Sequence, residues 1–220
     1  TIIQQKSGLA VGTRLICITG SGAQLAPDSA ITLKGNIATD TNEQNHGIFI
    51  QGAAGISDIL VGDVHGEDLR GDVIYVGGLE TAGVTGVTIG NVTGSNVLRN
   101  VVSVTGGQNI DVASIECTGP NGYMAFDIEP NANSQLCKNI TVGPIIGGHV
   151  GIVGLSASDF IEFVTITSMD LAPANAINTT PAYDPYFGYI EEIGLWLSNC
   201  RNVTIGSYKA RDFEHHAVRY

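Results

Sequence analysis

The acidic pair Asp127 and Glu129 is the feature of this sequence best suited to chemistry. The two residues lie two positions apart in segment 125–130, where apolar and polar residues alternate. In an extended strand such residues point to the same side, with Cα atoms about 6.5 to 7 Å apart. Hydrolysis of a glycosidic bond uses a carboxylic acid and a carboxylate, roughly 6.5–9.5 Å apart for inversion and about 5–5.5 Å for retention. The spacing therefore suits inverting acid–base hydrolysis. The plainer interpretation is two solvated surface acids.

Aromatic residues at the position of Asp127 in related segments indicate a surface for a sugar chain. Down the repeat, this outward position is occupied by Phe49, Tyr75, Ser103, Asp127, Gly154, Trp196 and Arg219. Sugar rings stack their C–H faces on aromatic rings, and small neighbours leave room for a chain to lie across them. We therefore predict that Phe49, Tyr75, Ser103 and Trp196 bind glycan. The alternative is that Phe49 and Tyr75 are covered by a loop or a neighbouring subunit.

Two interleaved series of short segments carry these residues. The first series has the pattern aliphatic–x–aliphatic–x–x–aliphatic and begins at Ile31, Ile59, Val87, Ile110, Ile140, Val164 and Val203. The second occupies 47–52, 73–78, 101–106, 125–130, 152–157 and 194–199, and a further copy begins at 217. Both series alternate with period two over four or five residues, which is the period of a strand. Two short strands in each repeat unit are typical of a solenoid.

The repeat predicts an all-β fold, a right-handed parallel β-helix (solenoid) of about seven to eight rungs. Variable rungs of twenty-odd residues favour the right-handed form, because the left-handed form uses hexapeptide repeats. Stacked rungs lie about 4.8 Å apart and bury each other's apolar faces. The predicted buried ladder consists of Ile48, Ile74, Val102, Phe126, Val153 and Leu195. We expect residues 1–220 to form a single domain from a longer chain. Residues 171–193 form an inserted loop that is functional, covers the helix or packs on a partner subunit.

Composition narrows the classes of partner. The chain has 220 residues with a formal net charge of −11, which argues against binding nucleic acid or an anionic membrane. Apolar runs are too short to span a bilayer. The cysteines, Cys17, Cys117, Cys137 and Cys200, show no C-x-x-C spacing, so we expect no zinc site. We expect four buried thiols, with a Cys117–Cys137 disulfide as the alternative.

Other polar residues are assigned weaker roles. Asp72 is either a third acid or a turn residue that bonds to the backbone. His215 and His216 follow Glu214, but adjacent residues on a strand point apart, so no metal site is expected there.

Two rungs resemble the pectate-lyase-like superfamily of right-handed parallel β-helix proteins. Gly71-Asp-Val-Ile-Tyr-Val-Gly-Gly78 resembles the Gly-Asp-Gly-Ile-Tyr-Ile-Gly-Gly rung of that family. Ala125-Phe-Asp-Ile-Glu-Pro-Asn131 is similar to its Gly-Ile-Asp-Ile-Glu-Pro-Asn rung, and Asn96–Gly106 lies where the family often has an Asn-rich rung with an Arg. The resemblance extends roughly from Gly47 to Tyr220. It implies polysaccharide lyases, glycoside hydrolases, epimerases and phage tailspike depolymerases.

The resemblance and the acidic pair together favour an enzyme, a glycoside hydrolase or depolymerase acting on an extracellular or cell-surface polysaccharide. No Asp-Pro-His motif and no set of pectate-lyase Ca²⁺ carboxylates is present, which disfavours the lyase or epimerase alternative. A hydrolase of this kind needs no cofactor, whereas a lyase would use Ca²⁺. The non-catalytic alternative is a glycan-binding adhesin or tail-fibre module. The implied location is extracellular, on a cell surface or on a virion, and related tailspikes imply a homotrimer.

Overall fold

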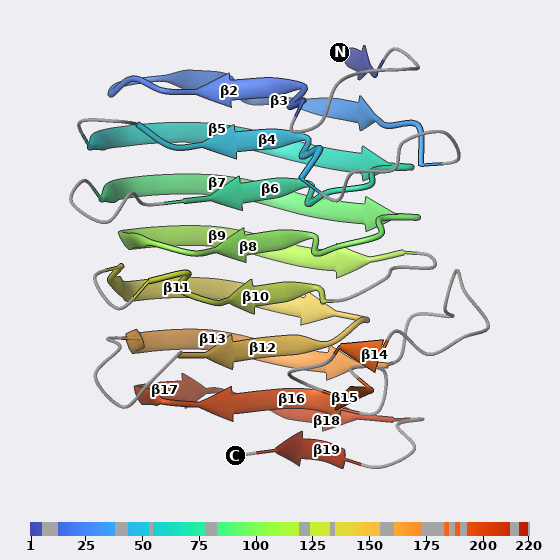
Figure 1. The fold of residues 1–220 in the computed structure, drawn as a ribbon, viewed down its shortest axis with the longest axis vertical. Helices are drawn as coiled ribbons and strands as arrows, with labels where there is room; N and C mark the ends of the chain where they lie inside the picture. The colour runs from blue at the N-terminus through green and yellow to red at the C-terminus, as the bar shows by residue number, and fades with distance from the viewer. Residues whose placement is uncertain are drawn as a thin grey trace.

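The chain folds as an all-β, right-handed parallel β-helix, as predicted (Figure 1). The computed structural model describes residues 1–5, 13–37, 44–52, 55–77, 83–118, 124–132, 135–154, 161–172, 183–184, 188–189, 193–211 and 216–219. Within these residues every element is a strand. The strands stack in two parallel sheets along the helix axis, because each rung contributes one strand to each sheet.

The first sheet is made of long strands and the second of short ones. The long-strand sheet contains β1 (Ile2–Gln4), β3 (Gln24–Lys34), β5 (Ile56–Glu67), β7 (Val84–Ser95), β9 (Gly107–Cys117), β11 (Cys137–Ile146), β13 (Ile161–Leu171), β17 (Cys200–Ile205) and β18 (Tyr208–Ala210). The short-strand sheet contains β2 (Ile16–Ile18), β4 (Ile48–Ile50), β6 (Ile74–Val76), β8 (Val102–Val104), β10 (Phe126–Ile128), β12 (Val150–Val153), β16 (Ile193–Ser198) and β19 (His216–Arg219). Both β17 and β18 pair with β13, so the described strands form eight levels, in agreement with the predicted seven to eight rungs.

Part of the predicted insertion at 171–193 lies outside the described residues. Between β13 and β16 the structure describes the strands β14 (Tyr183–Asp184) and β15 (Gly188–Tyr189), which pair antiparallel as a small separate sheet.

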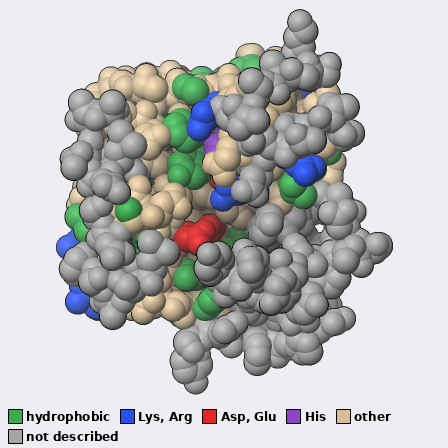
Figure 2. Space-filling model, in the orientation of Figure 1, with side chains coloured by type: hydrophobic (Ala, Val, Ile, Leu, Met, Phe, Trp, Pro, Cys, Tyr) green, Lys and Arg blue, Asp and Glu red, His purple; other side chains and the backbone are tan. Residues whose placement is uncertain are grey.

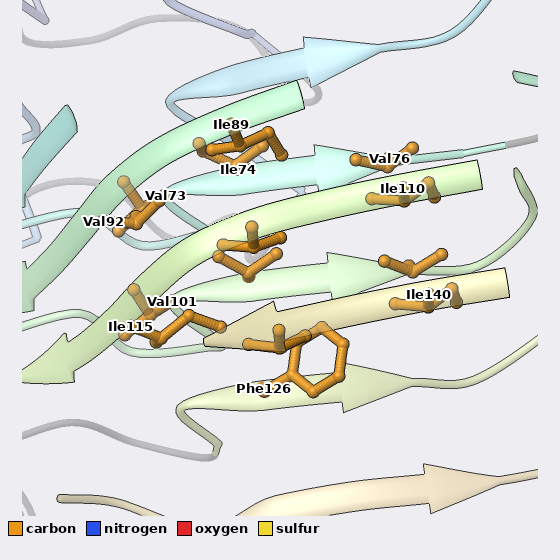
Figure 3. Close-up of a cluster of buried hydrophobic side chains, with 14 of the residues drawn as sticks. Val73, Ile74, Val76, Ile89, Val92, Val101, Ile110, Ile115, Phe126 and Ile140 are labelled. Carbon is orange, nitrogen blue, oxygen red and sulfur yellow. The ribbon is translucent and has the colours of Figure 1, made fainter. Parts of the chain in front are cut away.

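The core lies between the two sheets. Ile48, Ile74, Val102 and Phe126 stand in register on successive short strands, and each side chain is fully buried. Figure 3 shows apolar side chains of both sheets, such as Ile74, Phe126 and Ile110, pointing into this space. Alternation places every second residue of a short strand in the core, so the residues between must face outward.

The predicted ladder is wrong at Val153. Val150 is the residue that pairs with Phe126 on one side and Leu195 on the other, and Gly151, not Gly154, stands beside Asp127. The sequence Val-Gly-Ile-Val-Gly-Leu at 150–155 contains two alternating patterns that bury equally apolar residues. Stacking on the neighbouring rungs selects the earlier one.

Strand β3 also departs from the predicted repeat. Ile31 pairs with Val64 and not with Ile59, because the register shifts between Leu25 and Ala30. Pro27 lies within the shifted stretch and has no backbone N–H to give to a sheet, which is typical of an irregular strand.

All four cysteines are free thiols, so the alternative Cys117–Cys137 disulfide is not formed. Cys137 is buried, and this burial raises the pKa of its thiol to about 12. The expectation of four buried thiols is correct only for Cys137, because Cys117 and Cys200 are half-buried and Cys17 is exposed. Cys17 occupies the outward position of β2, in register with Phe49.

A column of residues with positive φ turns each long strand through a corner. Register places Asp58, Gly86, Asn109, Asn139, Phe163 and Asn202 at this corner in successive rungs, each with φ between 54° and 66°. Asn139 Nδ2 donates a hydrogen bond to Asn109 Oδ1 at 2.9 Å. Glycine, asparagine and aspartate adopt this left-handed conformation at low cost, whereas other residues are strained by roughly 1–2 kcal/mol. Phe163 is therefore strained, and it is also exposed.

Replacing Phe163 by asparagine should stabilise the protein. Phe163→Asn relieves the strain at φ 58° but loses the contact of the Lys138 ammonium with the ring, at 5.5 Å. A cation–π contact at an exposed site contributes about 0.5–1 kcal/mol, so the net gain should be roughly 0.5–1 kcal/mol. Urea denaturation would measure it. Phe163→Leu is the matched control, since it loses the same contact and keeps the strain; an equal gain in both variants would contradict the explanation.

Candidate active site

The outward positions of the short strands form one continuous column. In register, the column contains Cys17, Phe49, Tyr75, Ser103, Asp127, Gly151, Trp196 and Arg219. The structure thus places Ser103 on the rung next to Asp127, and Tyr75 and Trp196 two rungs away on opposite sides. At about 4.8 Å per rung, each aromatic residue stands roughly 10 Å from Asp127 along the column. Figure 2 shows this face, with acidic atoms near its middle and histidine and basic atoms above them.

Asp127 faces outward and yet is almost completely covered. Phe126 and Ile128 on either side of it point into the core, while Asp127 is only 6% exposed and Ser103 only 1%. Asn100, in the turn before β8, lies over both residues. Its Nδ2 donates to Ser103 Oγ at 2.9 Å and to Asp127 Oδ2 at 3.3 Å. Glu129, two residues after Asp127, is half-buried, so the two acids have different surroundings.

Gly151 leaves the space that the Asp127 side chain needs. A Cβ atom at this position would lie 2.5 Å from Met124 Sδ and 3.0 Å from Asp127 Oδ1. The first distance is shorter than real Cβ contacts and the second is tighter than most of them, so a side chain at this position would require Met124 to move and Asp127 to shift by a few tenths of an ångström.

A second buried acid, Asp72, lies in the turn before β6. Asn100 N–H donates to Asp72 Oδ1 at 3.0 Å, and Arg99 Nε lies 3.4 Å from the same oxygen. His46 Nδ1 lies 3.2 Å from Asp72 Oδ2 and 3.1 Å from the Asp72 N–H. A neutral ring can accept from that N–H, whereas a protonated ring can donate to the carboxylate. Asp72 is therefore more than a turn residue, because it is the centre of a charged network.

The two buried acids have opposite pKa directions. Burial opposes the charge of Asp72, but Arg99, His46 and the Asn100 N–H outweigh it and lower the pKa of Asp72. Burial, followed by the charges of Glu129 and Asp72, raises the pKa of Asp127 well above its ordinary value, against a smaller opposing effect of Arg99. Asp127 is therefore suited to hold a proton where exposed aspartates are ionised. The longer side chain of Glu129 favours that residue as the proton donor, whereas burial favours Asp127. Of the two, the buried Asp127 is the better candidate for the acid and Glu129 for the base.

Two of the predicted aromatic residues, Phe49 and Tyr75, stack on each other within the protein. The rings of Phe49 and Tyr75 lie 5.2 Å apart and are inclined by 9°. The His46 ring stacks 4.8 Å from Tyr75, and the Arg14 guanidinium lies 4.3 Å over the Phe49 ring. Both aromatic residues remain half-buried. Part of their ring surface is thus covered by His46 and Arg14 of the same chain.

The Tyr75 hydroxyl is tied to two other rungs. Thr105 Oγ1 and Tyr75 Oη are hydrogen-bonded at 2.8 Å, and Asn131 Nδ2 donates to the same hydroxyl at 3.2 Å. Burial raises the pKa of Tyr75. These bonds orient the ring. They also leave its hydroxyl edge less available to a ligand than its outward position in the column would suggest.

Sequence reasoning missed His46, Arg99 and Asn100. All three lie in turns that precede short strands, outside the alternating segments. The Asn-rich, Arg-containing stretch before β8 was the available signal for Arg99 and Asn100, while His46 had none. In the described part of the chain, no cluster of His, Cys, Asp or Glu could hold a metal ion, and no helix could cross a membrane. Residues Glu214 and His215 lie outside the described residues.

Comparison with known proteins found no match to a family model, to a curated protein or to a solved structure.

Proposed function

We propose that this protein is a polysaccharide-processing β-helix, a glycoside hydrolase that cleaves an extracellular or cell-surface glycan. The observation that carries the proposal is the combination of Asp127, which is buried and has a raised pKa, with the less buried Glu129, which comes directly after the end of the same short strand, β10. Two carboxyl groups in unlike surroundings are what acid–base hydrolysis requires, since one must hold a proton while the other is ionised. The resemblance of two rungs to the pectate-lyase-like superfamily supports the same class of substrate.

The proposed reaction divides the work between the two acids. Asp127 donates its proton to the glycosidic oxygen as the bond from that oxygen to the anomeric carbon breaks. Glu129 removes a proton from a water molecule, whose oxygen forms the new bond to the anomeric carbon. The products are two shorter glycans, one with a new reducing end, and a second proton transfer restores both residues.

The column also offers surfaces for the sugar chain on both sides of the acids. Tyr75 and Phe49 stand on one side and Trp196 on the other, each half-buried with part of the side chain exposed. Aromatic rings bind the C–H faces of sugars, so a chain running along the helix axis would place a bond near Asp127. Ser103 lies beneath Asn100 and would contribute by holding that residue in position.

Replacing either acid should lower turnover and leave the fold intact. After a screen of host-surface and extracellular polysaccharides, reducing-end release is measured for Asp127→Asn and Glu129→Gln. Each variant should lose at least about a hundredfold in turnover, the usual contribution of a general acid or base. Asp111→Asn, an exposed acid on the long-strand sheet, is the matched control and should release at the wild-type rate. Trp196→Ala should weaken binding and leave turnover by saturated protein nearly unchanged.

The same experiment separates the alternatives. Unchanged release in both acid variants removes the pair from the mechanism. Glycan binding without release by the wild type supports a non-catalytic adhesin or tail-fibre module, an alternative favoured by the near-complete cover of Asp127. An unsaturated, ultraviolet-absorbing product would indicate a lyase.

A further inference from the structure

We propose that Asp72 is a positioning residue: its negative charge keeps the proton on Asp127, and through Asn100 it orients that carboxyl group. This inference rests on the proposed function for its catalytic meaning. Its physical content, the division of charge between two buried acids, can be tested without a substrate.

Asn100 connects the two acids directly. Its backbone N–H donates to Asp72 Oδ1 at 3.0 Å, while its side-chain Nδ2 donates to Asp127 Oδ2 at 3.3 Å. The amide cannot rotate freely, because its Oδ1 accepts from the Met124 N–H at 3.0 Å and its Nδ2 also donates to Ser103. A shift of the Asp72 carboxylate would therefore be passed through one residue to the Asp127 carboxyl group.

The surroundings of the two acids are unequal, and this inequality decides where the negative charge resides. Asp72 is fully buried but has Arg99, His46 and a backbone N–H around its oxygens, all of which can stabilise a carboxylate. Within the described residues, Asp127 receives its hydrogen bond from Asn100 alone. Two nearby buried carboxyl groups cannot both ionise at low cost, so the charge goes to the better-stabilised Asp72 and the proton stays on Asp127.

Charged and titratable groups on several elements surround Asp127, and each could affect its titration. Glu129 lies on the same rung; Asp72 and Arg99 lie in the turns before β6 and β8. The Cys137 thiol, on β11, is influenced by the charge of Asp127 but stays protonated near neutral pH because burial raises its pKa to about 12. His149 is buried in the turn before β12, where its carbonyl accepts from the Ala125 N–H. Among the residues that the structure describes, Asp72 and Glu129 are thus the two carboxyl groups whose negative charge opposes the ionisation of Asp127.

The test is a carbon-detected NMR titration of the aspartate carboxyl groups in the free protein. In the wild type, Asp72 should be ionised at a pH where Asp127 is still protonated. In Asp72→Asn, which keeps the size of the side chain and removes its charge, the acid dissociation constant of Asp127 should increase at least about tenfold. Asp63→Asn removes an exposed acid from the other sheet and should leave Asp127 unchanged.

Two results would overturn the proposal. One is a wild-type titration in which Asp127 ionises before Asp72, which needs no variant and so does not depend on whether Asp72→Asn folds. The other is a folded Asp72→Asn protein in which Asp127 titrates as in the wild type.

Turnover then separates this proposal from the proposed function. If the protein cleaves a glycan, the alkaline limb of its pH–rate profile should move to lower pH in Asp72→Asn in parallel with the NMR titration of Asp127. A shifted titration with no cleavage of any glycan would support the division of charge and reject the hydrolase. Cleavage with an unshifted profile would retain the hydrolase and reject the role of Asp72.

Discussion

Val102→Asp should prevent stable folding at neutral pH. Val102 is fully buried in the ladder, in register with Ile74 and Phe126, and its surroundings contain apolar side chains. An ionised carboxylate placed there has no partner, and leaving such a charge uncompensated costs about 3–5 kcal/mol or more. Because total stabilities are about 5–15 kcal/mol, a loss of this size removes much of the folding free energy. Urea denaturation, relative to the wild type at the same pH, would measure it.

The pH dependence identifies the cause. Burial raises the folded-state pKa of the introduced carboxyl above its unfolded value, so the destabilisation is complete above the folded pKa and shrinks as pH falls toward the unfolded one. Thr165→Asp is the matched control: Thr165 is exposed on β13, between Thr141 and Thr204. That variant should lose little stability. Equal losses in the two variants would contradict the inward direction of Val102.

Phe126→Ala should cost roughly 3–5 kcal/mol, as expected when a buried phenylalanine is truncated. Phe126 is among the largest fully buried side chains, and Figure 3 shows its ring in the cluster between the two sheets. Removing the ring leaves a cavity between stacked rungs, whose paired backbones cannot move together to fill it. The free energy of unfolding from urea denaturation is the measurement.

Phe163→Ala provides the comparison, because Phe163 has the same ring but is 47% exposed. It should change stability far less than Phe126→Ala. A cost below about 1 kcal/mol for Phe126→Ala, or similar costs for both variants, would show that the Phe126 ring is not packed in the core.

The site departs from the rule that outward residues of a β-helix are solvated. Asp72 and Asp127 both lie outside the apolar core and are both buried, because turns from neighbouring rungs cover them. A buried acid on an outer face is costly unless it is paired or protonated. Asp72 is paired, because Arg99 and His46 lie beside it, whereas the raised pKa of Asp127 favours its protonated form.

The predicted site residues differ in how fully the structure brings them together. Ser103 stands directly beside Asp127, while Tyr75, Phe49 and Trp196 follow along the same column as predicted. The cover over Asp127 and Ser103 was not predictable, because it comes from Asn100, whose side chain joins its own rung to the rung of Asp127.

The sequence by itself determined the parallel β-helix, the two strands in each rung and which residues of most strands face inward. These properties follow from the period-two alternation and its recurrence, which are local and repeated often enough to be read without coordinates. Only the tertiary structure decided the register at Val150 and Ile31, because competing local patterns bury similar apolar area and stacking on neighbouring rungs selects one. It alone also decided that Asp127 is buried and that Arg99 and His46 lie beside Asp72. The reason is that both depend on turns from other rungs, and local alternation carries no information about which turn lies over which side chain.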